Sequence, residues 1–176
     1  FTWQTFCLGC TFPQAQILPF ALSYSNPSLF VGDAMVETLT SYPSVLPKVL
    51  SLLNNVLGEI DLAVYVNHMF WLILSLLAYY KFVRSYFSSQ RAALFCVFLL
   101  PMQFLMFYGY QSHWRTLFIH PSHNIIGFFF GLVAIFYWRR GRKVISSLSL
   151  LIGGYFHALS VIHLLILLVS SEVWNG

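Results

Sequence analysis

The acidic residue Asp33 is the first candidate for chemistry in this sequence. It follows the segment 26–32 (NPSLFVG), in which a proline and a glycine predict a turn. A carboxylate held at the edge of an apolar environment can act as a general base or as a metal ligand. The alternative is that Asp33 caps a short helix over 34–39, with Glu37 in its first turn. The two roles are compatible with each other.

A second candidate site is the polar segment 111–124 (QSHWRTLFIHPSHN). Arg115 is its only cation, and a guanidinium suits a phosphate or pyrophosphate, while snorkelling toward lipid head groups is the alternative role. His120 and His123 are three residues apart and could share a metal, but no cysteine or carboxylate is near them in the sequence to complete a ligand set. We therefore expect these histidines to hydrogen-bond at an interface, and we expect no metal site.

His157 is the third candidate, because it lies near the middle of the apolar stretch 144–169. An ionisable residue inside a membrane segment is costly and is a functional hypothesis by default. The alternative is a histidine whose polar atoms are satisfied by a neighbouring helix, and both interpretations also apply to His68. A pair such as His68 and His157 could ligate haem, although nothing in the sequence selects that role.

The composition predicts a membrane protein. Of the 176 residues, 59% are hydrophobic and 8% are charged, whereas soluble domains carry about 25% charged residues. So few charges cannot cover a water-facing surface, while lipid-facing positions require apolar side chains. The aromatic content of 19% fits lipid contact and interfacial belts. The sequence contains no phosphate-binding loop, no dinucleotide fingerprint and no basic–aromatic pattern, so we expect no nucleic-acid partner.

The pattern of apolar runs predicts an all-α, polytopic transmembrane helical bundle that forms a single module over residues 1–176. Residues 1–12 read as the tail of a first membrane helix that Pro13 ends, and we expect the chain to be a fragment. The CxxC pair in this tail, Cys7 and Cys10, has no second pair and predicts ordinary small residues. An amphipathic outer loop with short interfacial helices is expected over 13–60.

Three spans are expected after this loop, over 62–80, over 92–110 with a kink at Pro101, and over 122–138. The preceding apolar segment 44–58 is shorter than the roughly 20 residues that a span needs. The stretch 144–169 is either one long tilted helix or two short helices that meet near His157. The glycine pair before that histidine favours the broken form.

The basic residues predict the orientation in the membrane. Seven of the nine Lys and Arg residues lie in two short segments, 81–91 and 139–143. By the positive-inside rule both segments are cytoplasmic. Asp33, Glu59 and Asp61 then lie on the extracytoplasmic face, together with the polar segment 111–124. The predicted localisation is multi-pass in a membrane, most simply the inner membrane of a bacterium.

The order of these features resembles the N-terminal membrane module of GT-C-type glycosyltransferases. The resemblance rests on the outer-loop sequence QILPFALSYSNPSLFVGDAMVETL, on spans separated by small basic loops, and on the stretch GGYFHALSVIHLL with a histidine at its bend. It covers most of the chain and is one of architecture and loose pattern. It implies transfer of a sugar from a polyprenyl-phosphate donor on the extracytoplasmic face of the bilayer.

The resemblance also implies roles for particular residues. Asp33 matches best the acidic residue of the first outer loop, which acts as base or ligand of a divalent cation in that family. Arg115, His120, His123 and His157 would then bind the donor substrate. The family usually carries an acid soon after the first helix, where this chain has Gln14 and Gln16.

Because this acid is absent, the sequence fits an inactive member of the family as well as an active one. A transporter or channel subunit, and a non-catalytic membrane scaffold, are the alternative functions.

Overall fold

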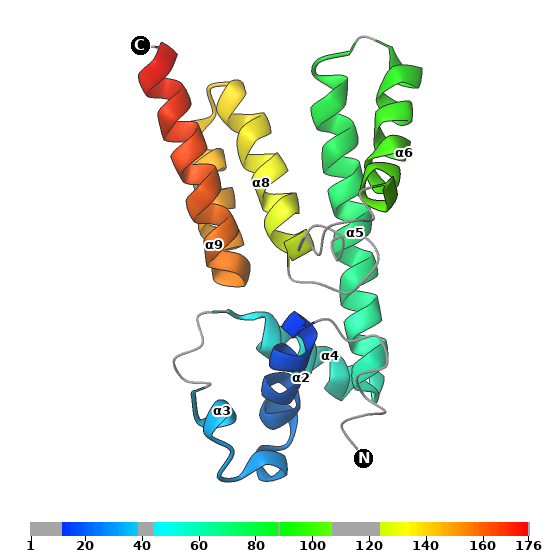
Figure 1. Ribbon diagram of the computed structural model, residues 1–176, viewed down its shortest axis with the longest axis vertical. Coiled ribbons are helices and arrows are strands. Elements are labelled where there is room, and N and C mark those ends of the chain that lie inside the picture. Colours follow the sequence, from blue (N-terminus) through cyan, green and yellow to red (C-terminus); the bar gives the residue numbers. More distant parts are fainter. Residues whose placement is uncertain (1–11, 39–43, 88, 107–123, 176) are drawn as a thin grey trace.

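The computed structural model describes residues 12–38, 44–87, 89–106 and 124–175, which form helices joined by short turns (Figure 1). The helices are α2 (Phe12–Ser25), the 3-10 helix η1 (Pro27–Phe30), α3 (Ala34–Glu37), α4 (Leu46–Leu57), α5 (Ile60–Arg84), α6 (Gln90–Met106), α8 (Asn124–Arg139) and α9 (Lys143–Asn175). No strand occurs among the described residues. The all-α prediction is therefore confirmed for this part of the chain.

The helices form an elongated bundle with a layer of short helices across its lower end (Figure 1). α5 runs along most of the molecule, and α6 folds back beside its upper part. On its other side α5 contacts α8, and α8 packs along α9. The layer consists of α2, η1, α3 and α4, and α4 contacts both α2 and α5. α4 lies within the segment 44–58, where we expected a short helix.

The helix α2 differs from the sequence prediction. We expected Pro13 to end a helix, but α2 begins at Phe12 and passes through both Pro13 and Pro19. Pro13 lies in the first turn, where a missing N–H costs no intrahelical hydrogen bond. Pro19 removes one such bond from the interior of the helix. Burial of the apolar side chains around it offsets this cost, namely those of Ile17, Leu18, Phe20 and Ala21.

α5 is the one helix in the described part of the chain that is long and apolar enough to cross a membrane. Its 25 residues extend about 37 Å. It outruns the predicted span at both ends because Asp61 in its first turn and Lys81 and Arg84 in its last turn interact favourably with the helix dipole. Only 22% of its most apolar stretch is buried, whereas the core helix of a soluble protein is mostly buried.

α9 is a hairpin of two antiparallel arms. His157 has φ −152° and ψ 84°, which separates a first arm over 143–156 from a second arm over 158–175. Leu150 of the first arm and Leu168 of the second pack in one cluster with Ala134 of α8. In one straight helix, Leu150 and Leu168 would lie about 27 Å apart, so their contact requires the two arms to run side by side. The break agrees with the broken form of this stretch that the sequence favours.

Small residues let α8 and the two arms of α9 approach closely. Gly153 is buried, and a Cβ added there would lie 2.9 Å from the Cβ of Phe130 in α8. The hydroxyl of Ser146 is also buried and donates a hydrogen bond to the carbonyl of Ala134 at 2.8 Å. Contacts through small residues and serine hydroxyls are typical of helices that pack where no water is present.

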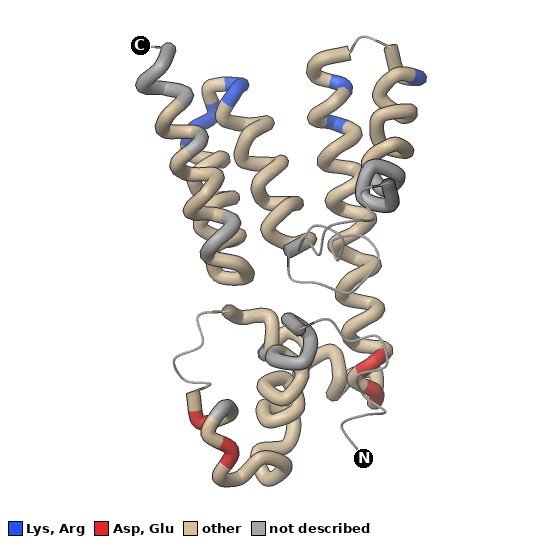
Figure 2. The backbone as a smooth tube through the Cα atoms, in the orientation of Figure 1, with Lys and Arg blue, Asp and Glu red and all other residues tan. Residues whose placement is uncertain are grey.

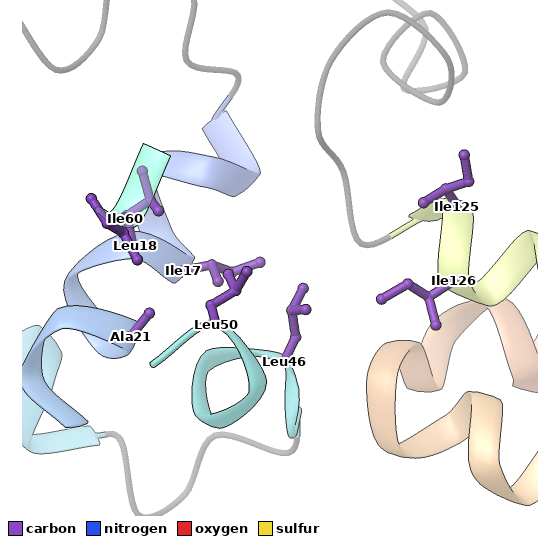
Figure 3. Close-up of a cluster of buried hydrophobic side chains, with 8 residues drawn as sticks. All are labelled: Ile17, Leu18, Ala21, Leu46, Leu50, Ile60, Ile125 and Ile126. Carbon is purple, nitrogen blue, oxygen red and sulfur yellow. The ribbon is translucent and has the colours of Figure 1, made fainter. Parts of the chain in front are cut away.

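The main core lies where the layer meets the bundle (Figure 3). It joins α2, α4, the start of α5 and the start of α8 through Ile17, Leu18, Ala21, Leu46, Leu50, Ile60, Ile125 and Ile126. In Figure 3 the side chains of Ile17 and Leu50 converge between α2 and α4. The backbone carbonyl of Ile125 accepts a hydrogen bond from the buried hydroxyl of Ser75 at 3.3 Å, which ties α8 to α5.

An aromatic cluster extends this core into the bundle. The indole ring of Trp71 in α5 lies 5.5 Å from Phe129 and 5.6 Å from Phe130 of α8, measured between ring centroids. It also lies 5.7 Å from Phe156, the last residue of the first arm of α9. Each such pair contributes about 0.5–1.5 kcal/mol beyond the burial of its area. The cluster therefore fixes α5, α8 and the bend of α9 relative to one another.

The packing of α9 predicts different effects on stability for alanine substitutions at the adjacent residues Gly153 and Gly154. Gly153→Ala places a methyl group against the Cβ of Phe130, which cannot rotate away, and we expect a loss of about 1–3 kcal/mol. Gly154→Ala meets Val161 at an ordinary 3.9 Å, so the higher helix propensity of alanine should leave stability unchanged or raise it by up to about 1 kcal/mol. Thermal unfolding of the detergent-solubilised protein measures both. Equal destabilisation by both variants would contradict the hairpin packing.

Candidate functional site

Asp33 lies at the start of α3 on the exposed side of the layer. The turn before it requires a positive φ of 78° at Gly32, which glycine adopts without strain. The Oδ1 atom of Asp33 accepts a hydrogen bond from the backbone N–H of Val36 at 3.3 Å, and its carbonyl accepts one from Glu37 at 3.0 Å. Asp33 therefore caps α3, as one of the two sequence interpretations predicted. Its side chain is exposed, so the carboxylate remains accessible to solvent.

His157 forms the break in α9, and the two carbonyls before it are held by the residues that precede α4. The N–H of Val45 donates to the carbonyl of Tyr155 at 2.9 Å, and the hydroxyl of Ser44 donates to the carbonyl of Phe156 at 3.0 Å. The same Ser44 hydroxyl accepts a hydrogen bond from the N–H of Leu46 at 3.2 Å. The C-terminal end of the first arm thus meets the N-terminal end of α4.

This end-to-end contact is favourable on two grounds. The last carbonyls of a helix and the first N–H groups of a helix both lack partners within their own helix, so each end satisfies the other. The helix dipoles add to this, because a partial negative charge at the end of the arm faces a partial positive charge at the start of α4. His157 itself is half-buried at the junction.

The structure does not bring the candidate residues Asp33 and His157 together. α3, which follows Asp33, lies at the lower end of the molecule and apart from the lower end of α9 (Figure 1). Arg115, His120 and His123, the other candidates, fall outside the described residues. Within the described part of the chain, no three His, Cys, Asp or Glu side chains gather in a position to hold a metal ion.

The other histidines of the described helices, His68 and His163, have different surroundings. His68 is buried in α5, with a relative exposure of 4%, one turn before Trp71 of the aromatic cluster. His163 is exposed on the second arm of α9. The neighbouring polar residue of α5, Asn67, accepts a hydrogen bond from the indole N–H of Trp71 at 3.2 Å. Asn67 therefore supports the aromatic cluster.

A polar network within the layer was not foreseen from the sequence. The hydroxyls of Ser25 in α2 and Ser51 in α4 lie 2.8 Å apart, and the amide of Asn54 donates to the Ser25 hydroxyl at 3.3 Å. These residues join α2 to α4 beside the hydrophobic core. In the sequence, Asn54 appears only as a polar interruption of an apolar run, and no local signal connects it to Ser25.

The two basic segments and most of the acids occupy opposite ends of the molecule (Figure 2). The seven Lys and Arg residues of the segments 81–91 and 139–143 lie at the upper end, as expected for two loops on one side. Four of the five acidic residues lie in the layer or at the start of α5, at the lower end: Asp33, Glu37, Glu59 and Asp61. The fifth acid, Glu172, belongs to the last turns of α9, which return to the upper end.

Comparisons with models of known protein families, with curated proteins and with solved structures find no match to this chain.

The junction between α4 and α9 predicts a specific loss of stability. Ser44→Ala removes the hydrogen bond to the carbonyl of Phe156, and we expect the free energy of unfolding to fall by about 1–3 kcal/mol because this carbonyl loses its donor in a part-buried position. Ser149→Ala is the matched control, since the Ser149 hydroxyl bonds only to Ile145 of its own arm at 2.9 Å. Chemical unfolding in detergent measures both, and equal losses would contradict the junction.

Proposed function

We propose that this chain is a multi-pass membrane protein whose basic end faces the cytoplasm. The supporting observation is that the two basic segments lie at one end and four of the five acids at the other, while the helix surfaces between them are apolar and exposed. On α5 the exposed apolar residues follow the spacing of one helix face: Leu62, Tyr65, Val66, Met69, Phe70, Ile73 and Leu77. Water would not favour such a surface, whereas lipid would.

The shorter helices fit a membrane when they are combined with the layer. The 16 residues of α8 extend about 24 Å, less than the roughly 30 Å of a hydrocarbon core. The first arm of α9 is similar in length. With their basic ends at the cytoplasmic surface, these helices end within the outer leaflet, and the layer of α2 and α4 covers the rest of the thickness. Non-helical backbone at that depth is tolerated when protein buries it, as at the junction with α4.

We further propose that the acidic end carries out sugar transfer from a lipid-phosphate donor, in line with the GT-C resemblance. The supporting observation is that Asp33 is exposed at the end where an extracytoplasmic acceptor would arrive. In this reaction the carboxylate takes the proton of the acceptor hydroxyl, and the acceptor oxygen forms a bond to the anomeric carbon. The bond from that carbon to the donor phosphate breaks, and the lipid phosphate leaves with its negative charge near a cation, for which Arg115 is the candidate.

A transporter or channel subunit is the second candidate function. Helices broken within the membrane often mark transport sites, and α9 is broken at His157. The carbonyls before that break already accept hydrogen bonds from Ser44 and Val45, so they are not open to a transported substrate. The break therefore favours a structural role, and we prefer the transferase proposal to the transporter.

The orientation predicts which positions a membrane-impermeant maleimide labels. In a variant without native cysteines, Val31→Cys at the exposed turn of the layer should react in intact cells. Gln90→Cys, exposed at the basic end, should react only after the membrane is permeabilised. If both positions react before permeabilisation, or neither does, the two ends are not separated by a bilayer and the multi-pass proposal is wrong.

The two roles of Asp33 can be separated by choice of substitution. Asparagine is a good helix cap, so Asp33→Asn keeps the hydrogen bond from Val36 and removes the base. We expect this variant to insert and fold normally and to lose transfer by about 100-fold or more. Glu37→Gln, an equally exposed neutralisation one turn away, is the control and should retain activity.

Transfer of radiolabelled sugar from polyprenyl-phosphate donors measures the activity of these variants in the full-length protein. Normal transfer by Asp33→Asn would exclude Asp33 as the base and leave the cap as its role. A wild-type protein without transfer to any acceptor would favour the inactive or scaffold alternative.

A further inference from the structure

The two basic segments at the upper end meet through an arginine and a tyrosine. The guanidinium of Arg139, at the end of α8, lies over the ring of Tyr86, just beyond α5, with 4.1 Å between its central carbon and the ring centroid. A cation held over an aromatic face in this way is attracted by the negative face of the ring. The contact brings the turn between α5 and α6 next to the turn between α8 and α9.

Other cations of this end are held in the same manner. Arg140 lies over the ring of Phe136 at 4.1 Å, and Lys143 lies over the ring of Trp138 at 5.2 Å. Stacking fixes the position of a guanidinium by its flat face, while its N–H groups point outward from its edge. A planar fork of N–H donors matches the oxygens of a phosphate. The upper end therefore presents cations in fixed positions.

The surroundings of these cations indicate which anion they bind. Seven of the nine cations belong to this end of the molecule, and four of the five acids lie at the other end, so the net charge of this end is strongly positive. Exposed apolar side chains begin directly beside the cations, with Val144 at 74% exposure next to Lys143. Phosphate groups adjoin an apolar surface in this way at the boundary between lipid head groups and acyl chains. Aromatic residues such as Trp138 and Tyr86 also favour that boundary.

We propose that the two basic turns form one binding site for the head group of an anionic phospholipid, with Arg139 and Tyr86 at its centre and Arg140 beside them in the chain. This inference rests on the proposed membrane orientation and goes beyond the proposed transfer reaction, which takes place at the opposite end. A head group bound here bridges the α5–α6 hairpin and the α8–α9 hairpin. Each cation near the surface contributes about fivefold to the preference for an anionic lipid.

The test is the lipid selectivity of the full-length protein reconstituted in phosphatidylcholine. Electron paramagnetic resonance with spin-labelled phosphatidylglycerol and spin-labelled phosphatidylcholine gives their relative association constants. We expect the wild-type protein to prefer phosphatidylglycerol. The double variant Arg139→Gln, Arg140→Gln, which removes both stacked guanidinium groups, should lower this preference by about 25-fold or to unity. Lys48→Gln, which removes an exposed cation from the layer, should leave it unchanged.

A second pair of variants tests the stacked geometry. Tyr86→Phe keeps an aromatic face under Arg139 and should retain the preference, whereas Tyr86→Ala should reduce it. The proposal is overturned by a wild-type protein without selectivity, by an equal loss in Lys48→Gln, or by a double variant that keeps the preference. Displacement of the labelled lipid by inorganic phosphate alone would show a simple anion site instead.

Maleimide labelling of Val31→Cys and Gln90→Cys reports the membrane orientation independently. Correct labelling without lipid selectivity would refute the head-group site alone, whereas incorrect labelling would refute the orientation on which it rests.

Discussion

The hydrogen bonds between the bend of α9 and the start of α4 are the contact on which the rest of the structure depends. A helix broken in apolar surroundings exposes carbonyl groups, and each group left without a donor costs about 1–3 kcal/mol. Ser44 and Val45 supply the donors, so the bend at His157 and the layer stabilise each other. The aromatic cluster and the main core both lie beside this junction, and both would lose their geometry if the layer moved away.

Features that depend on local sequence were predictable, and features that depend on distant partners were not. The position of α5 followed from its apolar run, and the cap formed by Asp33 followed from a turn and an acid before a short helix. The break at His157 followed from the glycine pair before it. The hydrogen bond from Ser44 to Phe156 joins residues far apart in the sequence, and nothing near Ser44 indicates its partner. The continuation of α2 through Pro13 and Pro19 was not predicted, because it depends on burial that offsets the cost of Pro19.

The candidate site likewise contains features that could be predicted from local sequence and features that could not. Charge segregation could be predicted because each loop carries its own cations, and the structure places both basic loops at one end. The meeting of Arg139 with Tyr86 could not be predicted, since it depends on how two hairpins pack. Convergence of Asp33 with Arg115, His120 and His123 remains a prediction, because these three residues lie outside the described part of the chain.

The hairpin form of α9 determines at which end of the molecule this helix finishes. One long helix over this stretch would carry the backbone from the basic end to the acidic end, whereas two arms that meet at His157 return it to the end where it started. In the proposed membrane orientation, the two arms together therefore add no net crossing of the bilayer. Counting apolar runs alone would therefore place the end of the second arm at the acidic end, whereas the structure places it at the basic end.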